Sequence, residues 1–284
     1  MAEIELSAVH EELVAPSFVL HPNIYKTAMG MKAEHGEARM TPDKRTHVVF
    51  MSGTGEHVRV WAPYTHLDPK RFTVHVIGVE NGLGGKSLAQ FYEERLARIF
   101  AEADRVVLVG HSFGAFMAFR IADPMHRHKI LRILAICGTP EYKYGPHERA
   151  MYLLPHPLSK SIYNLFIRDL FPSMLRRYYF YPSTPDEVVQ RFVAQNGLPE
   201  YEEIFLDRQI RKGNYFSNLE ILMPRTTLLM AERDCIFSPG YVRSLKKRYP
   251  SLDLRIIERS GHMAPVERID ELRNEVWRAI NAQD

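Results

Sequence analysis

Short apolar segments recur along the chain from residue 46 onward. They are rich in β-branched residues and lie at His47–Met51, Phe72–Val79, Arg105–Gly110, Ile130–Ile136, Thr226–Met230 and Leu252–Ile257. Continuous apolar runs of this length are typical of strands that a parallel sheet buries on both faces. We therefore expect these segments to form one mostly parallel sheet.

Helical periodicity separates these segments. The stretch from Ser112 to Ala122 is apolar nearly all round, and another helix is expected near Tyr241–Tyr249. Two further helices each carry an apolar stripe with steps of three and four residues: Leu88, Tyr92, Leu96 and Ile99 in one, and Val266, Ile269, Leu272, Val276 and Ile280 in the other. Alternation of strands and helices predicts βαβ units with right-handed crossovers.

The alternation stops between residues 140 and 222, where prolines and aromatic residues crowd the sequence. Prolines at this density favour short helices and turns over long helices. We expect residues 140–222 to form a mainly helical lid inserted between two parts of one α/β core, residues 1–139 and 223–284. Extended segments at Ser17–Leu20 and Ile24–His35 predict a leading antiparallel pair.

Composition narrows the functional classes. The chain has 284 residues, of which 45% are hydrophobic and 25% charged, and its formal net charge of +3 is too small to predict nucleic-acid binding. The acidic N-terminal residues do not resemble a signal peptide, and no apolar run reaches the length of a membrane span. Cys137 and Cys235 are too few for a disulfide framework and match no zinc spacing. We expect a cytoplasmic protein with neither a metal nor an organic cofactor.

The sharpest local motif is Gly110-His111-Ser112-Phe113-Gly114, which stands between a predicted strand and a predicted helix. A serine on so tight a turn needs small residues two positions away on either side, and Gly110 and Gly114 meet that need. The turn would raise the serine hydroxyl above the strand end and bring the Phe113 N–H to the start of the helix. Ser112 is therefore the predicted nucleophile.

A serine nucleophile needs a base and an acid that orients the base. His262 follows the last predicted strand, and Asp234 follows the strand before it, so both should lie at the same sheet edge as Ser112. Glu232 and Glu141 remain open as alternatives to Asp234. The oxyanion hole would combine the Phe113 N–H with that of Thr54 or Gly53, in the glycine-rich turn after the first strand.

Four stretches together resemble the α/β-hydrolase superfamily, near its small esterase, thioesterase and C–C-bond hydrolase members. They are Ser52-Gly53-Thr54-Gly55 with Trp61, Gly110 to Gly114, Glu232 to Pro239, and Ser260-Gly261-His262-Met263 with Glu267. The resemblance implies that Ser112, Asp234 and His262 occupy the triad positions. Ser52 departs from the pattern, because many members have histidine there.

The expected function is serine hydrolysis of a hydrophobic carboxylic ester or thioester, either free or carrier-bound, through an acyl-enzyme. Cleavage of a lactone or C–C bond and acyl transfer remain alternatives with the same triad. A ligand receptor that keeps the fold without turnover is the alternative from another class. The oligomeric state does not follow from the sequence.

Overall fold

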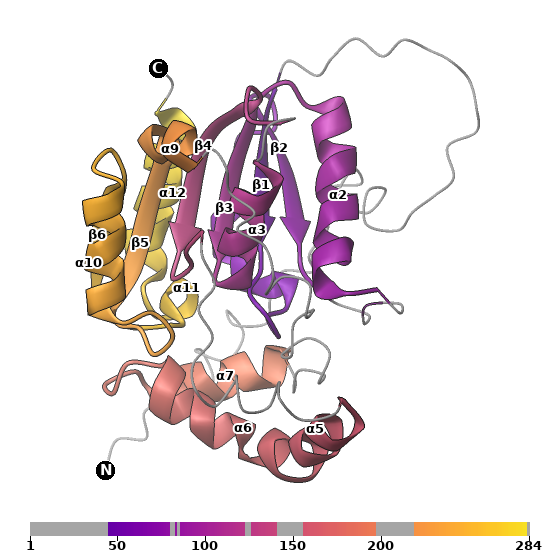
Figure 1. Ribbon diagram of the computed structural model, residues 1–284, viewed down its shortest axis with the longest axis vertical. Helices are drawn as coiled ribbons and strands as arrows, with labels where there is room; N and C mark the ends of the chain where they lie inside the picture. The colour runs from indigo at the N-terminus through magenta and orange to yellow at the C-terminus, as the bar shows by residue number, and fades with distance from the viewer. Residues whose placement is uncertain are drawn as a thin grey trace, which may run out of the picture. The chain divides into compact units, whose positions relative to one another are not determined.

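A computed structural model describes residues 45–79, 83, 86–122, 126–140, 156–196 and 219–282 of the chain. The predicted leading pair at residues 17–35 lies outside these ranges. Six described strands form one all-parallel sheet in the order β2-β1-β3-β4-β5-β6 (Figure 1). Their bounds are β1 Thr46–Met51, β2 Phe72–Ile77, β3 Val106–His111, β4 Ile130–Ile136, β5 Thr226–Arg233 and β6 Asp253–Gly261.

Helices cover both faces of this sheet. One face packs against α2 (Leu88–Glu102), α3 (Phe113–Ile121), α9 (Leu219–Leu222) with η5 (Met223–Arg225), and α10 (Pro239–Arg248). The other packs against η1 (Val58–Tyr64), α11 (Ala264–Glu267) and α12 (Ile269–Asn281). Alternate residues of a strand point to opposite faces, and both faces are apolar, which explains the continuous apolar runs in the sequence.

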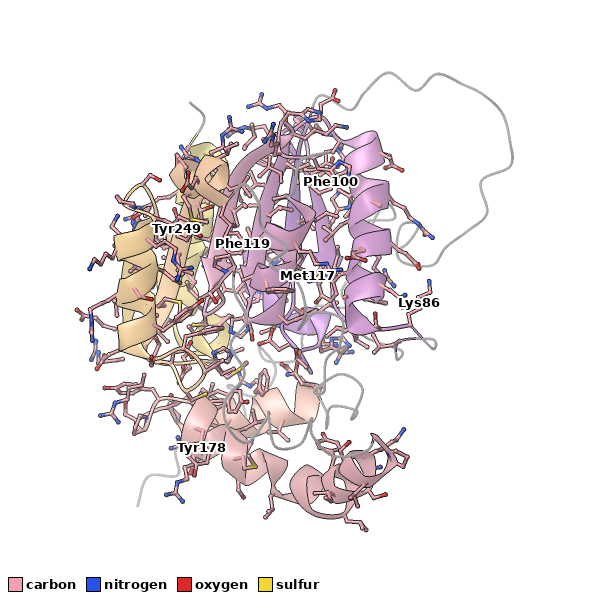
Figure 2. The ribbon with its side chains drawn as sticks, viewed as in Figure 1. Lys86, Phe100, Met117, Phe119, Tyr178 and Tyr249 are labelled. Carbon is pink, nitrogen blue, oxygen red and sulfur yellow. The ribbon has the colours of Figure 1, made fainter. Side chains whose placement is uncertain are left out.

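The two cores are well filled. Val49 and Met51 belong to the core under α2 and α3, whereas Val48 and Phe50 belong to the core under η1 and α12. Large buried side chains, among them Phe100, Met117 and Phe119, fill the first core (Figure 2). A capping box begins α2. The Ser87 hydroxyl oxygen accepts a hydrogen bond from the Gln90 N–H, and the Gln90 side-chain oxygen accepts one from the Ser87 N–H.

Short helical elements lie between β4 and β5. They are α5 (His156–Ile162), η2 (Tyr163–Ile167), α6 (Arg168–Met174), η3 (Leu175–Tyr179) and α7 (Asp186–Asn196). Two of them, η2 and η3, are π-helical turns, and Pro172 lies inside α6. Among the described residues, every helix is too short or too polar to traverse a bilayer.

Two boundaries differ from the sequence prediction. The last strand was expected to end at Ile257 with a loop to Gly261, but β6 continues to Gly261 past an irregularity in its pairing with β5 and a positive φ at Arg259. The final helix was expected to be continuous from Val266, but it is divided at Arg268 into α11 and α12. The apolar pattern does not reveal either difference, because the residues on both sides of each irregularity keep their buried faces.

Candidate active site

Ser112 occupies a strained turn between β3 and α3. Its φ of 50° and ψ of −115° lie outside the regions that side-chain-bearing residues normally adopt. Space around the turn admits only glycine at the flanking positions. A Cβ on Gly110 would lie 2.5 Å from the Ala115 nitrogen, and one on Gly114 would lie 2.2 Å from the Met51 carbonyl oxygen. The glycines therefore allow α3 to start directly above the end of β3.

The three predicted triad residues meet in space although they come from three different strand ends. His262 Nε2 lies 3.0 Å from Ser112 Oγ, and His262 Nδ1 lies 3.0 Å from Asp234 Oδ2. The side chains of His262 and Asp234 are almost completely buried. If the Nδ1 proton faces the carboxylate, Nε2 is left as an acceptor for the serine hydroxyl proton.

Asp234 is held in an ionised state by its surroundings. Burial alone would raise the pKa of its carboxyl, but the neighbouring His262 and the N–H groups of Phe237 and Ile236 offset burial, so that the pKa lies below its ordinary value. The two N–H groups donate to Asp234 Oδ1 over 2.9 and 2.8 Å. The other carboxylate oxygen is thereby free to face the imidazole.

Glu232, one of the two alternative acids, lies away from His262. Glu232 is exposed, and its carboxylate accepts a hydrogen bond of 2.7 Å from the Arg259 N–H, which supports the positive φ of that residue. Glu141 falls outside the described residues. Of the candidates whose position is described, Asp234 is the one that contacts His262.

The glycine-rich turn after β1 lies directly against Ser112. A Cβ on Gly53 would be 3.0 Å from the Ser112 Cβ. The Gly53 N–H is already engaged, because it donates to Glu56 Oε2 over 2.6 Å. No described residue accepts from the Thr54 N–H. Phe113 is the first residue of α3, where the N–H groups have no partner within the helix.

Ser52 has a structural role that its sequence position did not reveal. Its buried Oγ accepts a hydrogen bond of 3.1 Å from the Trp61 indole N–H, and its carbonyl accepts one of 2.6 Å from the Tyr92 hydroxyl. A Cβ on Gly78 would approach Ser52 Oγ to 2.8 Å, so the space around this residue is tight. The serine thus ties the turn to η1 and α2.

Replacing Ser52 by alanine should lower the free energy of unfolding by about 1–3 kcal/mol, because the buried Trp61 N–H would lose its acceptor. Urea denaturation followed by tryptophan fluorescence measures the change. Ser244→Ala is the matched control: its hydroxyl bonds an exposed helical carbonyl, that of Tyr241, and its loss should change stability by less than about 0.5 kcal/mol. Equal effects of the two substitutions would contradict the role assigned to Ser52.

Glu56, which no sequence motif marks as functional, is buried beside the predicted triad. Its Oε1 lies 2.6 Å from Nδ1 of His111, and Nε2 of His111 lies 2.8 Å from the backbone carbonyl of His262. Burial acts against both charges, yet their mutual attraction lowers the pKa of Glu56 and raises that of His111. In the sequence, His111 stands out only as part of the predicted nucleophile turn.

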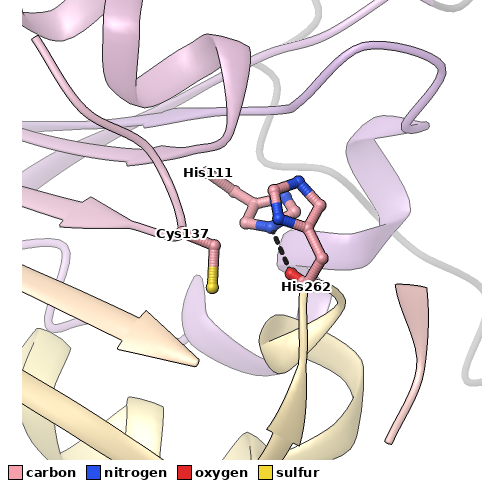
Figure 3. A group of neighbouring side chains, drawn as sticks. All are labelled: His111, Cys137 and His262. Atoms are coloured by element: carbon pink, nitrogen blue, oxygen red, sulfur yellow. Dashed lines mark hydrogen bonds between the residues drawn. The ribbon is translucent and has the colours of Figure 1, made fainter. Parts of the chain in front are cut away.

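His111, Cys137 and His262 form a buried cluster whose ligand atoms lie within 4.8 Å of one another (Figure 3). Both imidazoles already face other partners through each of their nitrogens: Glu56 and the His262 carbonyl for one, Asp234 and Ser112 for the other. Burial and the nearby Asp234 charge raise the pKa of the Cys137 thiol, which disfavours the thiolate that a metal would need. The cluster therefore lacks ligand atoms ready for a metal ion.

The helical elements after β4 contact His262 and the residues that follow it. The Met263 N–H donates to the Tyr179 carbonyl over 3.0 Å, and the Tyr179 ring meets the His262 ring edge-on at 5.5 Å. Glu267 joins the two regions: one oxygen accepts from the Gly261 N–H (2.7 Å) and the other from the Tyr181 N–H (2.6 Å). The segment that follows η3 is thus fastened beside His262.

Two arginines of the helical segment between β4 and β5 make contacts within that segment. Arg176 pairs with Asp186 at 2.9 Å and also donates to the carbonyls of Tyr181 and Pro182. Arg177 lies over the exposed ring of Tyr178. The side chain of Arg168 lies outside the described residues.

Comparisons with known proteins agree with this architecture. Three solved structures superpose on most of the chain at low sequence identity. An esterase from Thermogutta terrifontis has a TM-score of 0.64 and 13% identity, over 85% of this chain and 92% of the esterase. A structure from a study of carboxylesterases of Nitrososphaera gargenis has a TM-score of 0.63 and 16% identity, over 84% and 90%. A bromoperoxidase from Bacillus anthracis has a TM-score of 0.63 and 12% identity, over 84% and 93%.

No curated protein sequence matches the chain significantly. The model of the alpha/beta hydrolase family matches residues 48–275, which include every strand of the described sheet in whole or in part and all three residues at the candidate site. The chain belongs to the alpha/beta hydrolase family.

Proposed function

We propose that this protein is a serine hydrolase that cleaves a carboxylic ester or thioester through an acyl-enzyme. The observation that carries the proposal is the continuous chain of contacts from Asp234 through His262 to Ser112, with both distances at 3.0 Å and the serine on a strained turn. A nucleophile, a base and a group that orients the base are the minimum that this chemistry needs.

The mechanism follows from the arrangement of these groups. His262 Nε2 takes the hydroxyl proton as Ser112 Oγ attacks the carbonyl carbon, and Asp234 stabilises the resulting imidazolium. The Phe113 and Thr54 N–H groups stabilise the negative charge on the carbonyl oxygen, because the Gly53 N–H is already bound to Glu56. His262 then gives its proton to the leaving alcohol or thiol. In the second half, His262 activates a water molecule that hydrolyses the acyl-enzyme.

The substrate class is inferred from the surroundings of the base. The ring centroids of Tyr179 and Phe237 lie 5.5 and 6.5 Å from that of the His262 imidazole. An apolar acyl group therefore suits this neighbourhood better than a charged one. Two of the structurally similar proteins are described as esterases or carboxylesterases, which supports the same choice. We further propose that residues 140–222 act as a lid, since Tyr179 and Tyr181 contact Met263 and Glu267, which follow His262 in the chain.

Labelling with a fluorophosphonate tests the proposal directly. The wild-type protein should react at one residue, and peptide mapping by mass spectrometry should place the adduct on Ser112. Ser112→Ala should not be labelled. Ser159→Ala is the control, because Ser159 is also buried but lies outside the triad. Absence of wild-type labelling, or equal labelling of Ser112→Ala, would refute the serine hydrolase proposal.

A substrate screen then separates the reaction types. Esters of p-nitrophenol with acyl chains of increasing length, matched acyl thioesters and lactones should be assayed in parallel. We expect turnover of esters or thioesters with a preference for apolar acyl groups. Turnover confined to lactones, or acyl transfer to an added alcohol in preference to water, would replace ester hydrolysis with one of the alternative reactions.

A further inference from the structure

Two buried ionisable side chains lie directly beneath the triad and are not used in the mechanism above. Glu56 and His111 expose only 4% and 1% of their surfaces, and their facing atoms are 2.6 Å apart. Glu56 follows β1 in the turn that holds Gly53, and His111 is the last residue of β3, immediately before Ser112. The pair therefore connects two strand ends from inside the fold.

The contacts of His111 define where its protons are. Its Nε2 faces the carbonyl oxygen of His262 at 2.8 Å (Figure 3), and a carbonyl only accepts, so Nε2 must carry a proton. A neutral ring would then present an unprotonated Nδ1 to the Glu56 carboxylate at 2.6 Å, which would be repulsive. The pair must therefore hold one further proton, either on Nδ1 of the ring or on the Glu56 carboxyl. The raised pKa of His111 and the lowered pKa of Glu56 favour placing it on the ring.

Each partner also holds a piece of the proposed machinery. Glu56 Oε2 accepts from the Gly53 N–H at 2.6 Å, next to the proposed oxyanion donor Thr54. His111 donates to the backbone of His262, the proposed base. The ring centroids of His111 and His262 are 5.0 Å apart, but no contact between the His111 and Ser112 side chains is found among the described residues. His111 thus acts through the base rather than on the substrate.

We propose that Glu56 and His111 form an imidazolium–carboxylate brace that positions the oxyanion turn and the base relative to each other. Both are positioning residues, and the inference rests on the proposed serine hydrolase function. Hydrogen bonds made by Glu56 aim the Thr54 N–H at the developing oxyanion, and the bond from His111 fixes the backbone that carries the His262 ring. Small displacements of such groups reduce the rate strongly, because the donors must meet the transition-state oxygen within hydrogen-bonding distance.

Two substitutions at Glu56 separate this role from a purely structural one. Glu56→Ala removes the acceptor for Gly53 and the partner of His111, and we expect kcat to fall by about 100-fold with KM changed less than about threefold. Glu56→Gln should recover most of the loss, because its carbonyl can accept from Gly53 and its amide can donate to Nδ1 of a neutral ring. Glu94→Gln, at an exposed ion pair with Lys86, is the matched control.

Each kcat is expressed per Ser112 that a fluorophosphonate labels to completion. A structural defect would reduce the number of labelled sites but would leave kcat per site unchanged. Wild-type kcat per labelled site in Glu56→Ala would overturn the brace, and so would a Glu56→Gln variant as impaired as Glu56→Ala. Absence of labelling in the wild-type protein would instead refute the hydrolase function itself, so the two failures are distinguishable.

If Glu56→Ala does not fold, a His111 variant and the ¹⁵N spectrum of the histidines test the same proposal. His111→Asn keeps a donor near the Nδ1 position for Glu56 but removes the donor to the His262 carbonyl, and kcat per labelled site should fall at least tenfold. In the ¹⁵N spectrum of histidine-labelled protein, assigned with the Asn variant, His111 should appear as an imidazolium with both nitrogens protonated and become neutral in Glu56→Gln. A neutral His111 in the wild-type protein, or full activity per site in His111→Asn, would overturn the proposal.

Discussion

Replacing His262 by alanine is expected to lower kcat for an activated ester by a factor on the order of 10⁶, as much as loss of Ser112 itself. Ser112 Oγ would lose the acceptor 3.0 Å away, and a serine hydroxyl without a base is a poor nucleophile near neutral pH. Asp234→Asn should cost about 10⁴-fold, because the amide would favour the wrong tautomer of His262. Initial rates with a p-nitrophenyl ester measure both.

Loss of a histidine outside the site should not lower kcat, and a second histidine variant tests this. His66→Ala is suitable, since His66 is exposed and should leave kcat unchanged. Circular dichroism and thermal unfolding should show that the His262 variant remains folded. Retention of more than about one-tenth of wild-type kcat in His262→Ala would refute its role as base. Unchanged activity in Asp234→Asn would reopen Glu232 and Glu141 as the orienting acid.

The second large effect concerns the backbone around the nucleophile. Gly114→Ala should lower the free energy of unfolding by about 3 kcal/mol or prevent folding, because the new Cβ would meet the Met51 carbonyl oxygen at 2.2 Å and the Ser52 carbonyl oxygen at 2.7 Å. Those atoms are backbone at the end of β1 and cannot move without parting β1 from α3. In a domain of this size, the loss corresponds to a fall in Tm of roughly 6 °C.

Gly240→Ala is the matched control for this substitution. Gly240 also lies in the first turn of a helix, α10, but a Cβ there would meet nothing within 4 Å. Alanine should therefore raise the stability slightly, by about 0.5–1 kcal/mol, through its better helix propensity. Differential scanning calorimetry measures both variants. Equal Tm values for the two alanine variants would show that the close approach at Gly114 does not constrain the fold.

Hydrophobic patterning predicted the fold because this sheet is buried on both faces. All six predicted strands are present, and the alpha/beta hydrolase fold is confirmed. Local irregularities were not predictable from apolar runs. The continuation of β6 to Gly261 depends on the Glu232 carboxylate, which accepts from the Arg259 N–H where φ is positive. A side-chain contact across 27 residues leaves no trace in the periodicity of either strand.

The candidate site was only partly predictable for a similar reason. The proximity of Ser112, Asp234 and His262 was predictable because each follows a strand, and parallel strands end at one edge of a sheet. Glu56 was overlooked because an acidic residue in a glycine-rich turn is usually solvated, and only the structure brings it against His111. One signal was present: the glutamate stands three residues after Gly53, a spacing at which a carboxylate can fold back to accept the glycine N–H.

The candidate site combines residues that are far apart in the sequence, and this separation determines when activity appears during folding. Ser112 and His262, which touch, are 150 residues apart in sequence, and Asp234 reaches the site from another strand. Closing such long loops is entropically costly until the intervening strands have docked, so partly assembled chains cannot hold the three groups together. Recovery of ester turnover after dilution from denaturant should therefore lag behind the return of helical circular dichroism. Catalysis would then report completion of the sheet.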